Sequence, residues 1–280
     1  MTAEVIELLA GRRTVVDMTV GSGGHAAALL EAGVSRLVGV DRDPEALALA
    51  RERLSAFGDR VRLVGALFSE VDEDVVGGRA DGVLFDLGVS SMQLDRPERG
   101  FGYRVDGPLD MRMGEGSGAA APSAADLVNG LPERDLADLI FRFGEEPRSR
   151  RIAAAIVRRR PIRTTDQLTG IIVGAVGKRP GGPHPARRTF QALRIAVNRE
   201  LEELTAALPP AAGLLGPGGR MVVISYQSLE DGIVKRAFRD DDRLRILTKK
   251  PMVPTAEERA RNPRSRSAKL RAAEREPVAA

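Results

Sequence analysis

Short apolar runs alternate with helical patterns in the first third of the chain. Runs rich in β-branched residues predict strands, and apolar residues three or four positions apart predict helices. The predicted strands are residues 14–20, 36–41, 61–67 and 81–86, and the predicted helices are residues 24–31 and 44–56. Strands joined through helical crossovers form a parallel sheet that is covered on both faces. We therefore predict a doubly wound α/β domain with a Rossmann-like, mostly parallel sheet.

Beyond this region the pattern becomes helical, without intervening strands. Stretches rich in glycine and proline predict loops, and stretches with apolar residues at helical spacing predict helices. The loops are 107–123 and 178–185, and the helices lie within 124–160 and at 166–176, the last capped by Thr164 or Thr165. Apolar residues at heptad-like steps then predict one long amphipathic helix. These residues are Phe190, Leu193, Val197, Leu201, Leu204 and Leu208.

A later segment returns the chain to the sheet, because a glycine-rich turn at 216–219 precedes an apolar run at 220–226 that predicts a strand. We therefore predict three parts. They are a discontinuous α/β domain of residues 1–102 and 190–254, an inserted helical domain of residues 103–189, and a basic C-terminal tail of residues 255–280. Because the tail is polar and charged, we expect it to become ordered only when a partner binds.

The composition excludes several classes of protein. With 42% hydrophobic residues, a chain of 280 residues can bury a sizeable core. The chain has no cysteine, which excludes disulfides, thiolate metal sites and a cysteine nucleophile. Its two histidines, His25 and His184, do not predict a histidine-rich metal site. We find no signal-peptide pattern and no apolar run long enough to span a bilayer, so we expect a soluble, cytoplasmic protein.

Basic residues are clustered, although the net charge is only +4. Clustered arginine is typical of proteins that bind a polyphosphate partner. Acidic residues at 145–146 and 257–258 are interleaved with these clusters, so a solvated, salt-bridged surface explains them equally well. The clustered residues are Arg148, Arg150, Arg151, Arg158, Arg159, Arg160, Arg163, Lys178, Arg179, Arg187, Arg188, Arg259, Arg261, Arg264, Arg266, Lys269 and Arg271.

A glycine-rich loop follows the first predicted strand, where parallel sheets bind their ligands. The sequence Asp17-Met18-Thr19-Val20-Gly21-Ser22-Gly23-Gly24 opens directly into a helix, and glycines there let the backbone approach a ligand closely. Asp41 ends the second strand about 20 residues later, where a carboxylate binds ribose hydroxyls. The loop alone also fits a structural tight turn, and the loop with Asp41 also fits a nicotinamide cofactor.

Asp17 favours a cationic methyl donor over a dinucleotide. A carboxylate beside the loop would repel a pyrophosphate, but it would attract the sulfonium and ammonium groups of S-adenosylmethionine. The third glycine of the dinucleotide fingerprint is also absent. Asp86 ends the fourth strand at the same edge of the sheet, where its carboxylate could accept a substrate N–H. The alternative for Asp86 is a cap within an Asp-x-Gly turn.

Motifs along nearly the whole chain resemble, in order, those of the bacterial 16S ribosomal RNA (cytosine-N4)-methyltransferases, which are cytoplasmic enzymes. A long series of ordered matches is far more specific than the glycine loop alone. The matching segments are Gly23-Gly24-His25, Asp41-Arg42-Asp43-Pro44, 86–95, Arg99-Gly100-Phe101, 106–113, 184–195, Ser228-Leu229-Glu230-Asp231 and 262–267.

The resemblance implies a class I S-adenosylmethionine-dependent methyltransferase fold with an inserted helical domain. It implies methylation of the exocyclic N4 amine of a decoding-centre cytidine in the 16S rRNA of the small ribosomal subunit, with no metal required. It also implies a set of residues that bind the donor. These are Gly23, Gly24, His25, Asp41, Phe68, Asp86 and Gln93. From the residues alone, His25 would only start a helix and Phe68 would belong to the core.

Three departures from the family pattern are present. An HxPVL-like segment usually precedes the first helix, whereas this sequence starts at residues 1–5 as Met-Thr-Ala-Glu-Val, which predicts that a preceding segment is missing. Gln227 stands where a histidine commonly precedes Ser-Leu-Glu-Asp, so we expect no histidine base there. Residues 18–22 read Met-Thr-Val-Gly-Ser instead of the more usual Gly-Thr-Phe-Gly-Arg.

Methylation of an exocyclic amine requires an acceptor for an amine hydrogen and a donor held near attack distance. Asp86 is our candidate catalytic residue, aided by backbone carbonyls near Leu87 and Gly88. Methylation at cytosine C5 commonly uses a cysteine nucleophile, and the chain has none. The missing cysteine therefore favours the amine over the ring carbon.

The target base has to leave its stack in order to enter the site. Single-stranded RNA is often bound by aromatic side chains, so we predict that Phe101 or Tyr103 stacks on the base. The alternative for both residues is ordinary packing. Arg112, His184 and Arg188 are predicted to face RNA phosphates.

Other functions also fit the sequence. The chain could methylate another RNA, DNA or protein, or it could be a non-catalytic RNA-binding assembly factor that retains the fold. A nicotinamide oxidoreductase is a further alternative. The long helix that begins near Phe190 could also serve a homodimer.

Overall fold

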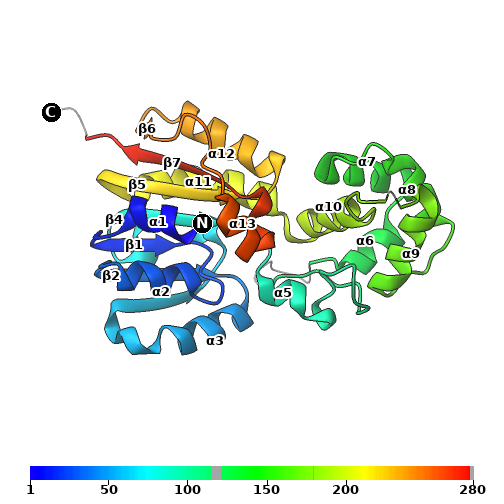
Figure 1. Cartoon of the computed structure of the whole chain (residues 1–280), viewed down its shortest axis with the longest axis horizontal. Helices are drawn as coiled ribbons and strands as arrows, with labels where there is room; N and C mark the ends of the chain where they lie inside the picture. Colours follow the sequence, from blue (N-terminus) through cyan, green and yellow to red (C-terminus); the bar gives the residue numbers. More distant parts are fainter. Residues whose placement is uncertain (115–120, 179, 278–280) are drawn as a thin grey trace. The chain divides into compact units, whose positions relative to one another are not determined.

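The computed structural model describes residues 1–114, 121–178 and 180–277. The chain forms two compact units, the first comprising Met1–Gly88 and Leu201–Ala280 and the second comprising Val89–Glu200. The first unit is an α/β domain, and the second is built mainly from helices (Figure 1). The inserted unit extends further in both directions than the predicted range of 103–189.

The first unit is built on a seven-stranded sheet with the order β3-β2-β1-β4-β5-β7-β6. The strands are β1 (Thr14–Asp17), β2 (Arg36–Asp41), β3 (Val61–Gly65), β4 (Ala80–Asp86), β5 (Leu215–Ser225), β6 (Leu244–Ile246) and β7 (Lys269–Arg275). Pairs among β1–β5 are parallel, whereas β7 is antiparallel to both of its neighbours. This arrangement is that of the class I methyltransferases, and the predicted fold class is confirmed.

Helices follow most strands of the first unit, and the inserted unit contributes a second group. Those of the first unit are α1 (Thr2–Leu9), α2 (Gly24–Glu31), α3 (Pro44–Arg53), α4 (Glu73–Val76), α12 (Ser228–Asp240) and α13 (Ala256–Arg261), with short 3-10 turns η1 (Ser55–Arg60), η2 (Phe68–Glu70) and η4 (Pro263–Ser267). Those of the second unit are α5 (Ser91–Asp95), η3 (Pro97–Arg99), α6 (Ala124–Gly130), α7 (Glu133–Gly144), α8 (Ser149–Val157), α9 (Thr165–Val176) and α10 (Arg187–Asn198), and α11 (Glu200–Leu214) follows them.

Local sequence signals explain where individual helices begin. The Asp43 side chain accepts a hydrogen bond from the Glu45 N–H at 3.1 Å, and Pro44 occupies the first helical position of α3. A proline is tolerated there because the first N–H groups of a helix have no intrahelical partner. Thr164 caps α9 in the same way, as its sequence predicts.

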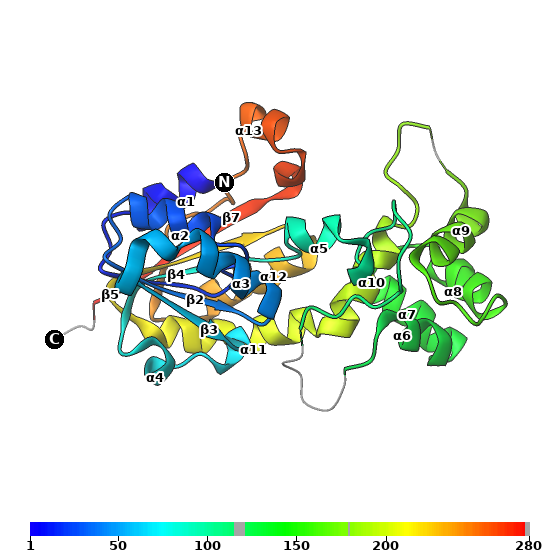
Figure 2. The ribbon, with the colours of Figure 1, turned by 90° about the horizontal axis from the view of Figure 1, so that it is seen from below.

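Two apolar cores cover the two faces of the sheet. Successive strand residues point to opposite faces, so Val83 and Phe85 enter one core while Leu84 enters the other. The first core contains residues of α11 and α12, and the second contains residues of α1 and α2. Figure 2 shows α1 and α2 on one side of the strands and α4 and α11 on the other. Burial on both faces explains why the parallel strands read as nearly continuous apolar runs.

The second unit has a core of its own. Apolar residues of α6–α10 form this core, together with Leu109, Met111 and Met113 from the preceding loop. Leu136, Ile140, Ile152 and Ile156 within it are completely buried. Fully burying side chains of this size stabilises a fold by about 1.5–3 kcal/mol each. The second unit is therefore a packed domain and not a surface loop.

The prediction of one long helix from Phe190 to Leu208 is wrong. The helix is broken at Arg199, which has a left-handed φ of 51° and ends α10 before α11 begins. A left-handed backbone conformation at a residue other than glycine cannot be predicted from the spacing of apolar residues. The apolar residues of α10 are buried in the core of the second unit, and those of α11 are buried in the first.

The prediction of an unstructured basic tail from residue 255 is also wrong. This segment contains α13 and β7, and β7 is an interior strand of the sheet. Leu270, Ala272 and Ala273 of β7 are buried, but alanine flanked by charged residues is not typical of a strand sequence. The predicted turn at 216–219 lies within β5, where pairing jumps from Ala80–Leu215 to Gly82–Arg220.

None of the helices in the described ranges is long and apolar enough to cross a membrane. The described ranges also contain no group of three or more His, Cys, Asp or Glu residues placed to hold a metal ion. Part of the predicted loop at 107–123 lies outside the described residues, as does Arg179.

Candidate active site at the carboxyl edge of the sheet

The glycine-rich loop between β1 and α2 forms a backbone cradle. Gly23 caps α2 with a left-handed φ of 82°, a conformation that side-chain-bearing residues rarely adopt. A Cβ at Gly23 would also lie 3.2 Å from Leu54 Cγ, which is tighter than ordinary van der Waals contact. The loop therefore requires glycine at this position both for its backbone conformation and for close packing on α3.

Asp41 holds this loop from the end of β2. One carboxylate oxygen accepts the Gly21 N–H at 2.9 Å, and the other accepts the Asp43 N–H at the same distance. Burial raises the pKa of Asp41, although these two hydrogen bonds act against the rise. Each carboxylate oxygen accepts more than one hydrogen bond, so Asp41 retains the capacity to bind hydroxyl groups. The structure thus brings Asp41 and the glycine loop together, as the sequence predicts.

Asp86 lies at the end of β4 with a partner at each carboxylate oxygen. Oδ1 accepts a hydrogen bond from the Tyr226 hydroxyl at 3.0 Å, and Oδ2 lies 3.4 Å from Nε2 of His25. The Asp86 N–H donates to Thr19 Oγ1 at 2.7 Å, which fixes the end of β4 against the glycine loop. His25, Asp86 and Tyr226 thus form one hydrogen-bonded and ionic cluster at the carboxyl edge of the sheet.

His25 carries a polar atom that its surroundings leave unpaired. Nδ1 of this residue is buried and has no hydrogen-bond partner among the residues that the structure describes. Burial acts to lower the pKa of His25, but the hydrogen bond to Asp86 and the charges of Asp86 and Asp17 outweigh it, and the pKa is raised. Buried polar atoms are normally paired, so Nδ1 is suited to contact a polar group of a bound ligand.

Asp17 contributes a buried carboxyl group to the same site. Its side chain is 1% exposed and accepts the Thr19 N–H at 3.2 Å. Burial raises the pKa of Asp17 to about 7, and Asp86 and Asp41 add to the rise, while His25 acts against it. Asp17 therefore changes its charge near neutral pH, which makes the attraction of this site for a cation dependent on pH.

The affinity of the site for S-adenosylmethionine is expected to increase with pH. Asp17 is mostly neutral at pH 6 and mostly ionised at pH 8, and a carboxylate attracts a sulfonium cation. His25 also loses its positive charge as the pH rises, so both groups make the site more attractive to a cation at higher pH. We expect the dissociation constant, measured by titration calorimetry, to fall several-fold between these pH values.

The variant Asp17→Asn is the control for this pH dependence. It removes the titration of Asp17 and also the Asp17 charge that helps to raise the pKa of His25, while the titration of the ligand is kept. Its dissociation constant should therefore vary much less with pH. An equally steep dependence in Asp17→Asn would exclude Asp17 as the responsible group.

Phe68 and Gln93, the other two residues in the implied donor-binding set, belong neither to the glycine loop nor to the cluster of His25, Asp86 and Tyr226. Phe68 belongs to η2 in the first unit, is only partly buried and packs edge-on against Phe85, with ring centroids 5.7 Å apart. Gln93 belongs to α5 in the second unit and is 5% exposed. Its amide oxygen accepts the Ser90 N–H at 3.1 Å, which forms a capping box at the start of α5.

The predicted base-stacking residues differ in exposure. Phe101 is 5% exposed and belongs to the core of the second unit, so its packing is explained without RNA. Tyr103 is partly exposed and stacks on His184, with ring centroids 4.8 Å apart and planes at 18°. Burial and the charge of Lys178 lower the pKa of His184, so this ring is mainly neutral at pH 7. Tyr103 is therefore the better placed of the two to receive a base.

The predicted phosphate-facing arginines are both paired with carboxylates. Arg112 forms a two-pronged bond with Asp110, at 2.9 Å and 2.6 Å, and is 44% exposed. Arg188 is 52% exposed, and its guanidinium lies 3.7 Å from Glu146. Both guanidinium groups are largely exposed, whereas the Glu146 side chain is only 5% exposed, so an anion can reach each arginine from the solvent side.

Thr19 and Tyr226 are site residues that the sequence did not identify. Tyr226 directly follows β5, which is the neighbour of β4 in the sheet, so it had to lie near Asp86 once the strand order was known. The strand order was the missing information, because Tyr226 and Asp86 are separated by 140 positions in the sequence.

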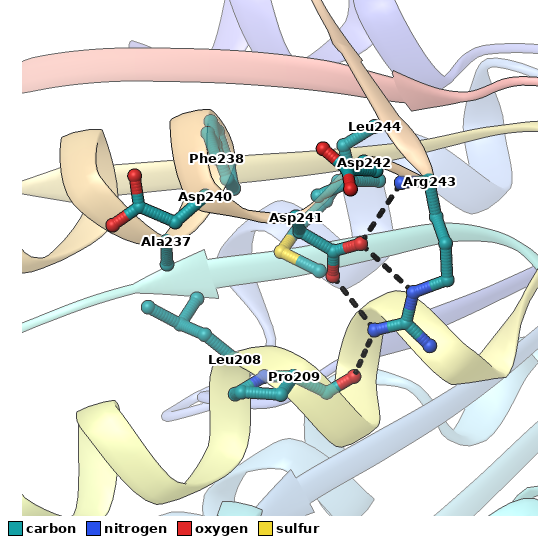
Figure 3. Close-up of a pocket in the computed structure, with 10 residues that line it drawn as sticks. Leu208, Pro209, Ala237, Phe238, Asp240, Asp241, Asp242, Arg243 and Leu244 are labelled. Atoms are coloured by element: carbon teal, nitrogen blue, oxygen red, sulfur yellow. Dashed lines mark hydrogen bonds and ion pairs between the residues drawn. The ribbon is translucent and has the colours of Figure 1, made fainter.

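A separate pocket of about 470 Å³ lies in the first unit. Figure 3 shows that residues of α11, α12 and the connection to β6 line it. The Arg243 guanidinium within it is held by both oxygens of Asp241 and by the Pro209 carbonyl. The residues lining this pocket do not include Asp17, His25 or Asp86, so we assign it no part in the site.

Comparisons with known proteins agree with these features. A sequence profile of the MraW methylase family matches residues 1–276. The ribosomal RNA small subunit methyltransferase H of Methylobacterium sp. (strain 4-46) is 51% identical over 309 residues, which covers 99% of this chain and 90% of that protein. The protein of the same name from Synechococcus sp. (strain JA-2-3B'a(2-13)) is 50% identical and covers 98% and 90%. The chain therefore belongs to the MraW methylase family.

Proposed function

We propose that this protein transfers a methyl group from S-adenosylmethionine to the exocyclic N4 amine of a decoding-centre cytidine in 16S rRNA of the small ribosomal subunit. The single observation that carries the proposal is the Asp86 carboxylate at the end of β4, held between His25 and Tyr226 beside the glycine loop. The names of the relatives support small-subunit ribosomal RNA as the substrate.

The residues of the first unit fit the donor. Backbone groups of the glycine loop can approach it closely, and Asp41 can accept hydrogen bonds from its ribose hydroxyls. Nδ1 of His25 offers a buried polar atom without a partner among the described residues. Asp17, when it is ionised, supplies a negative charge that attracts a cationic ligand and would repel a pyrophosphate. This charge distribution favours S-adenosylmethionine over a nicotinamide dinucleotide.

For methyl transfer, the protein has to position the donor and the cytosine amine and to accept a proton. S-adenosylmethionine, when bound, supplies a methyl group that is already activated on a sulfonium. The amine of cytosine is a weak nucleophile because its lone pair is delocalised into the ring. Asp86 accepts a hydrogen bond from this amine, which favours a more pyramidal nitrogen, and takes the proton that the nitrogen releases when the N–C bond forms. No covalent link between enzyme and RNA is required.

The second unit is proposed to bind the RNA. Tyr103 stacks on a base, and Arg112 and Arg188 contact phosphates through their exposed guanidinium groups. Tyr103 stacks on His184 and packs edge-on against Phe190, with ring centroids 5.7 Å apart, so the base would contact the part of the ring that these two neighbours leave exposed. A homodimer stays a prediction. The apolar residues of α10 and α11 are buried within the chain, so these two helices offer no apolar face for a second copy.

Replacing Tyr103 by alanine is expected to raise KM for the RNA substrate about tenfold, because stacking of a base on an aromatic ring contributes about 1–3 kcal/mol. Tyr103→Phe keeps the ring and should keep KM close to the wild-type value. Steady-state kinetics at saturating donor would measure both. An unchanged KM in Tyr103→Ala would show that Tyr103 only packs against its neighbours.

The proposed function is tested by transfer of labelled methyl from S-adenosylmethionine to three acceptors. These are small ribosomal subunits that lack their native methylations, large subunits and duplex DNA. We expect label only in small subunits. Label in DNA or large subunits would favour a methyltransferase with another substrate, and binding to small subunits without donor affinity would favour an assembly factor.

A further inference from the structure

The Tyr226 hydroxyl is placed to fix one oxygen of the Asp86 carboxylate. It donates to Oδ1 at 3.0 Å, whereas Oδ2 has only the weaker contact with His25 at 3.4 Å. The ring of Tyr226 also lies beside the turn that follows Asp86, because a Cβ built on Gly88 would be 3.7 Å from Tyr226 Cδ2. The two ends of β4 and β5 are further joined by a hydrogen bond from the Leu87 N–H to the Ile224 carbonyl.

This tyrosine stays a hydrogen-bond donor at all physiological pH values. Burial, followed by the negative charge of Asp86 and the hydrogen bond to it, raises the pKa of Tyr226 well above its usual range. A hydroxyl that keeps its proton holds the ionised carboxylate in one orientation, because a charge-assisted hydrogen bond is short and directional. It does not compete with Asp86 for the proton of a substrate.

The Ser-Leu-Glu-Asp motif holds Tyr226 in place. Glu230 is 2% exposed, and one of its carboxylate oxygens accepts the N–H groups of Tyr226 and Gln227 at 2.9 Å and 3.1 Å. Asp231 pairs with Arg271 of β7 at 2.7 Å, which anchors the start of α12 to the sheet. The motif is thus bonded to the backbone of the residue whose hydroxyl reaches Asp86.

We propose that Tyr226 is a positioning residue, which orients the Asp86 carboxylate so that Oδ2 faces the amine of the target base, and that Glu230 secures Tyr226 for this task. The proposal rests on the proposed function, since it assigns Asp86 as the proton acceptor. Orientation matters because only a proton acceptor within hydrogen-bond reach and correctly aligned assists the reaction.

The test is the variant Tyr226→Phe, which removes one hydroxyl and keeps the ring. We expect kcat to fall between about 10-fold and about 100-fold, since hydrogen bonds to charged groups contribute about 1.5–3 kcal/mol. KM for the RNA and the dissociation constant of S-adenosylmethionine should stay near the wild-type values, and the unfolding temperature should fall, because a partly buried hydrogen bond to a carboxylate is lost. A merely structural role would lower the unfolding temperature and leave kcat unchanged.

Ser225→Ala is the matched control. Ser225 is the last residue of β5 and directly precedes Tyr226. Its hydroxyl donates to the Lys269 carbonyl of β7 at 3.4 Å and not to a residue of the site. This variant should keep the wild-type kcat, which would show that removing any hydroxyl from this strand end is not sufficient. A wild-type kcat in Tyr226→Phe would overturn the inference but leave the proposed function intact, whereas an inactive wild-type protein would overturn the proposed function itself.

Discussion

Replacing Asp86 by alanine is expected to abolish turnover, a loss of about a thousandfold or more, because a positioned proton acceptor contributes about 10²–10⁴-fold to a rate. Without the carboxylate, the amine of the base has no acceptor for its hydrogen, and the Tyr226 hydroxyl loses its partner. The affinity for S-adenosylmethionine should fall modestly or more, but it should not be abolished, since Asp41 and the glycine loop remain. Single-turnover rates and titration calorimetry would measure the two effects separately.

Asp81→Asn provides the control for this variant. Asp81 lies near the other end of β4, where one carboxylate oxygen accepts the Thr14 N–H at 2.9 Å. This variant alters the same strand without altering the site, so it should keep turnover while losing some stability. Near-normal turnover in Asp86→Ala would exclude the assigned role of Asp86.

Replacing Asn198 by alanine is expected to destabilise the second unit by about 3 kcal/mol, since a buried polar group left unpaired costs about 1–3 kcal/mol. Asn198 is 3% exposed, and its amide group bonds the Met111 carbonyl at 2.8 Å and the Met113 N–H at 2.9 Å. Met111 has a left-handed φ of 64°, a conformation that is costly for a residue with a side chain. Asn198 therefore holds the turn that presents Arg112.

Loss of this turn should also impair RNA binding. Below the unfolding temperature, Asn198→Ala is expected to raise KM for small subunits about tenfold, because Arg112 would no longer be held in one position. Denaturant unfolding would measure the stability, and steady-state kinetics would measure KM. The affinity for S-adenosylmethionine should be largely retained, since Asp17, His25 and Asp41 belong to the other unit.

Asn129→Ala is the matched control. The Asn129 amide group bonds the Ile162 N–H and carbonyl at 2.8 Å and 2.7 Å, which is the same type of bracing elsewhere in the same unit. It should lower stability without raising KM. An equal rise of KM in both variants would show that general loosening of the unit, and not the turn at Met111, weakens RNA binding.

The sequence predicts the parallel part of the sheet well, because buried parallel strands read as continuous apolar runs. The predicted ranges 24–31 and 36–41 coincide with α2 and β2. β7 escapes this reasoning because two alanines between charged residues resemble a helix or a loop more than a strand. The break at Arg199 escapes it because backbone conformation at a single residue does not alter the apolar periodicity.

The site is predictable only in part for a related reason. Gly23 follows the first strand of a recognisable α/β pattern, and Asp41 and Asp86 end the second and fourth strands, so their meeting at one edge follows from the fold class. The contact between Tyr226 and Asp86 depends on β5 lying next to β4, after the whole inserted unit. The aromatic pair of Tyr103 and His184 likewise depends on packing between segments distant in sequence.

Nucleoside analysis by mass spectrometry of the small-subunit RNA, after methyl transfer by the purified protein, identifies the atom that is methylated. If Asp86 serves an exocyclic amine, the labelled nucleoside should be N4-methylcytidine, and Asp86→Ala should not produce it. A label in 5-methylcytidine or in a 2′-O-methylated ribose would contradict the account, because those products place the methyl group on an atom that bears no amine hydrogen for Asp86 to accept.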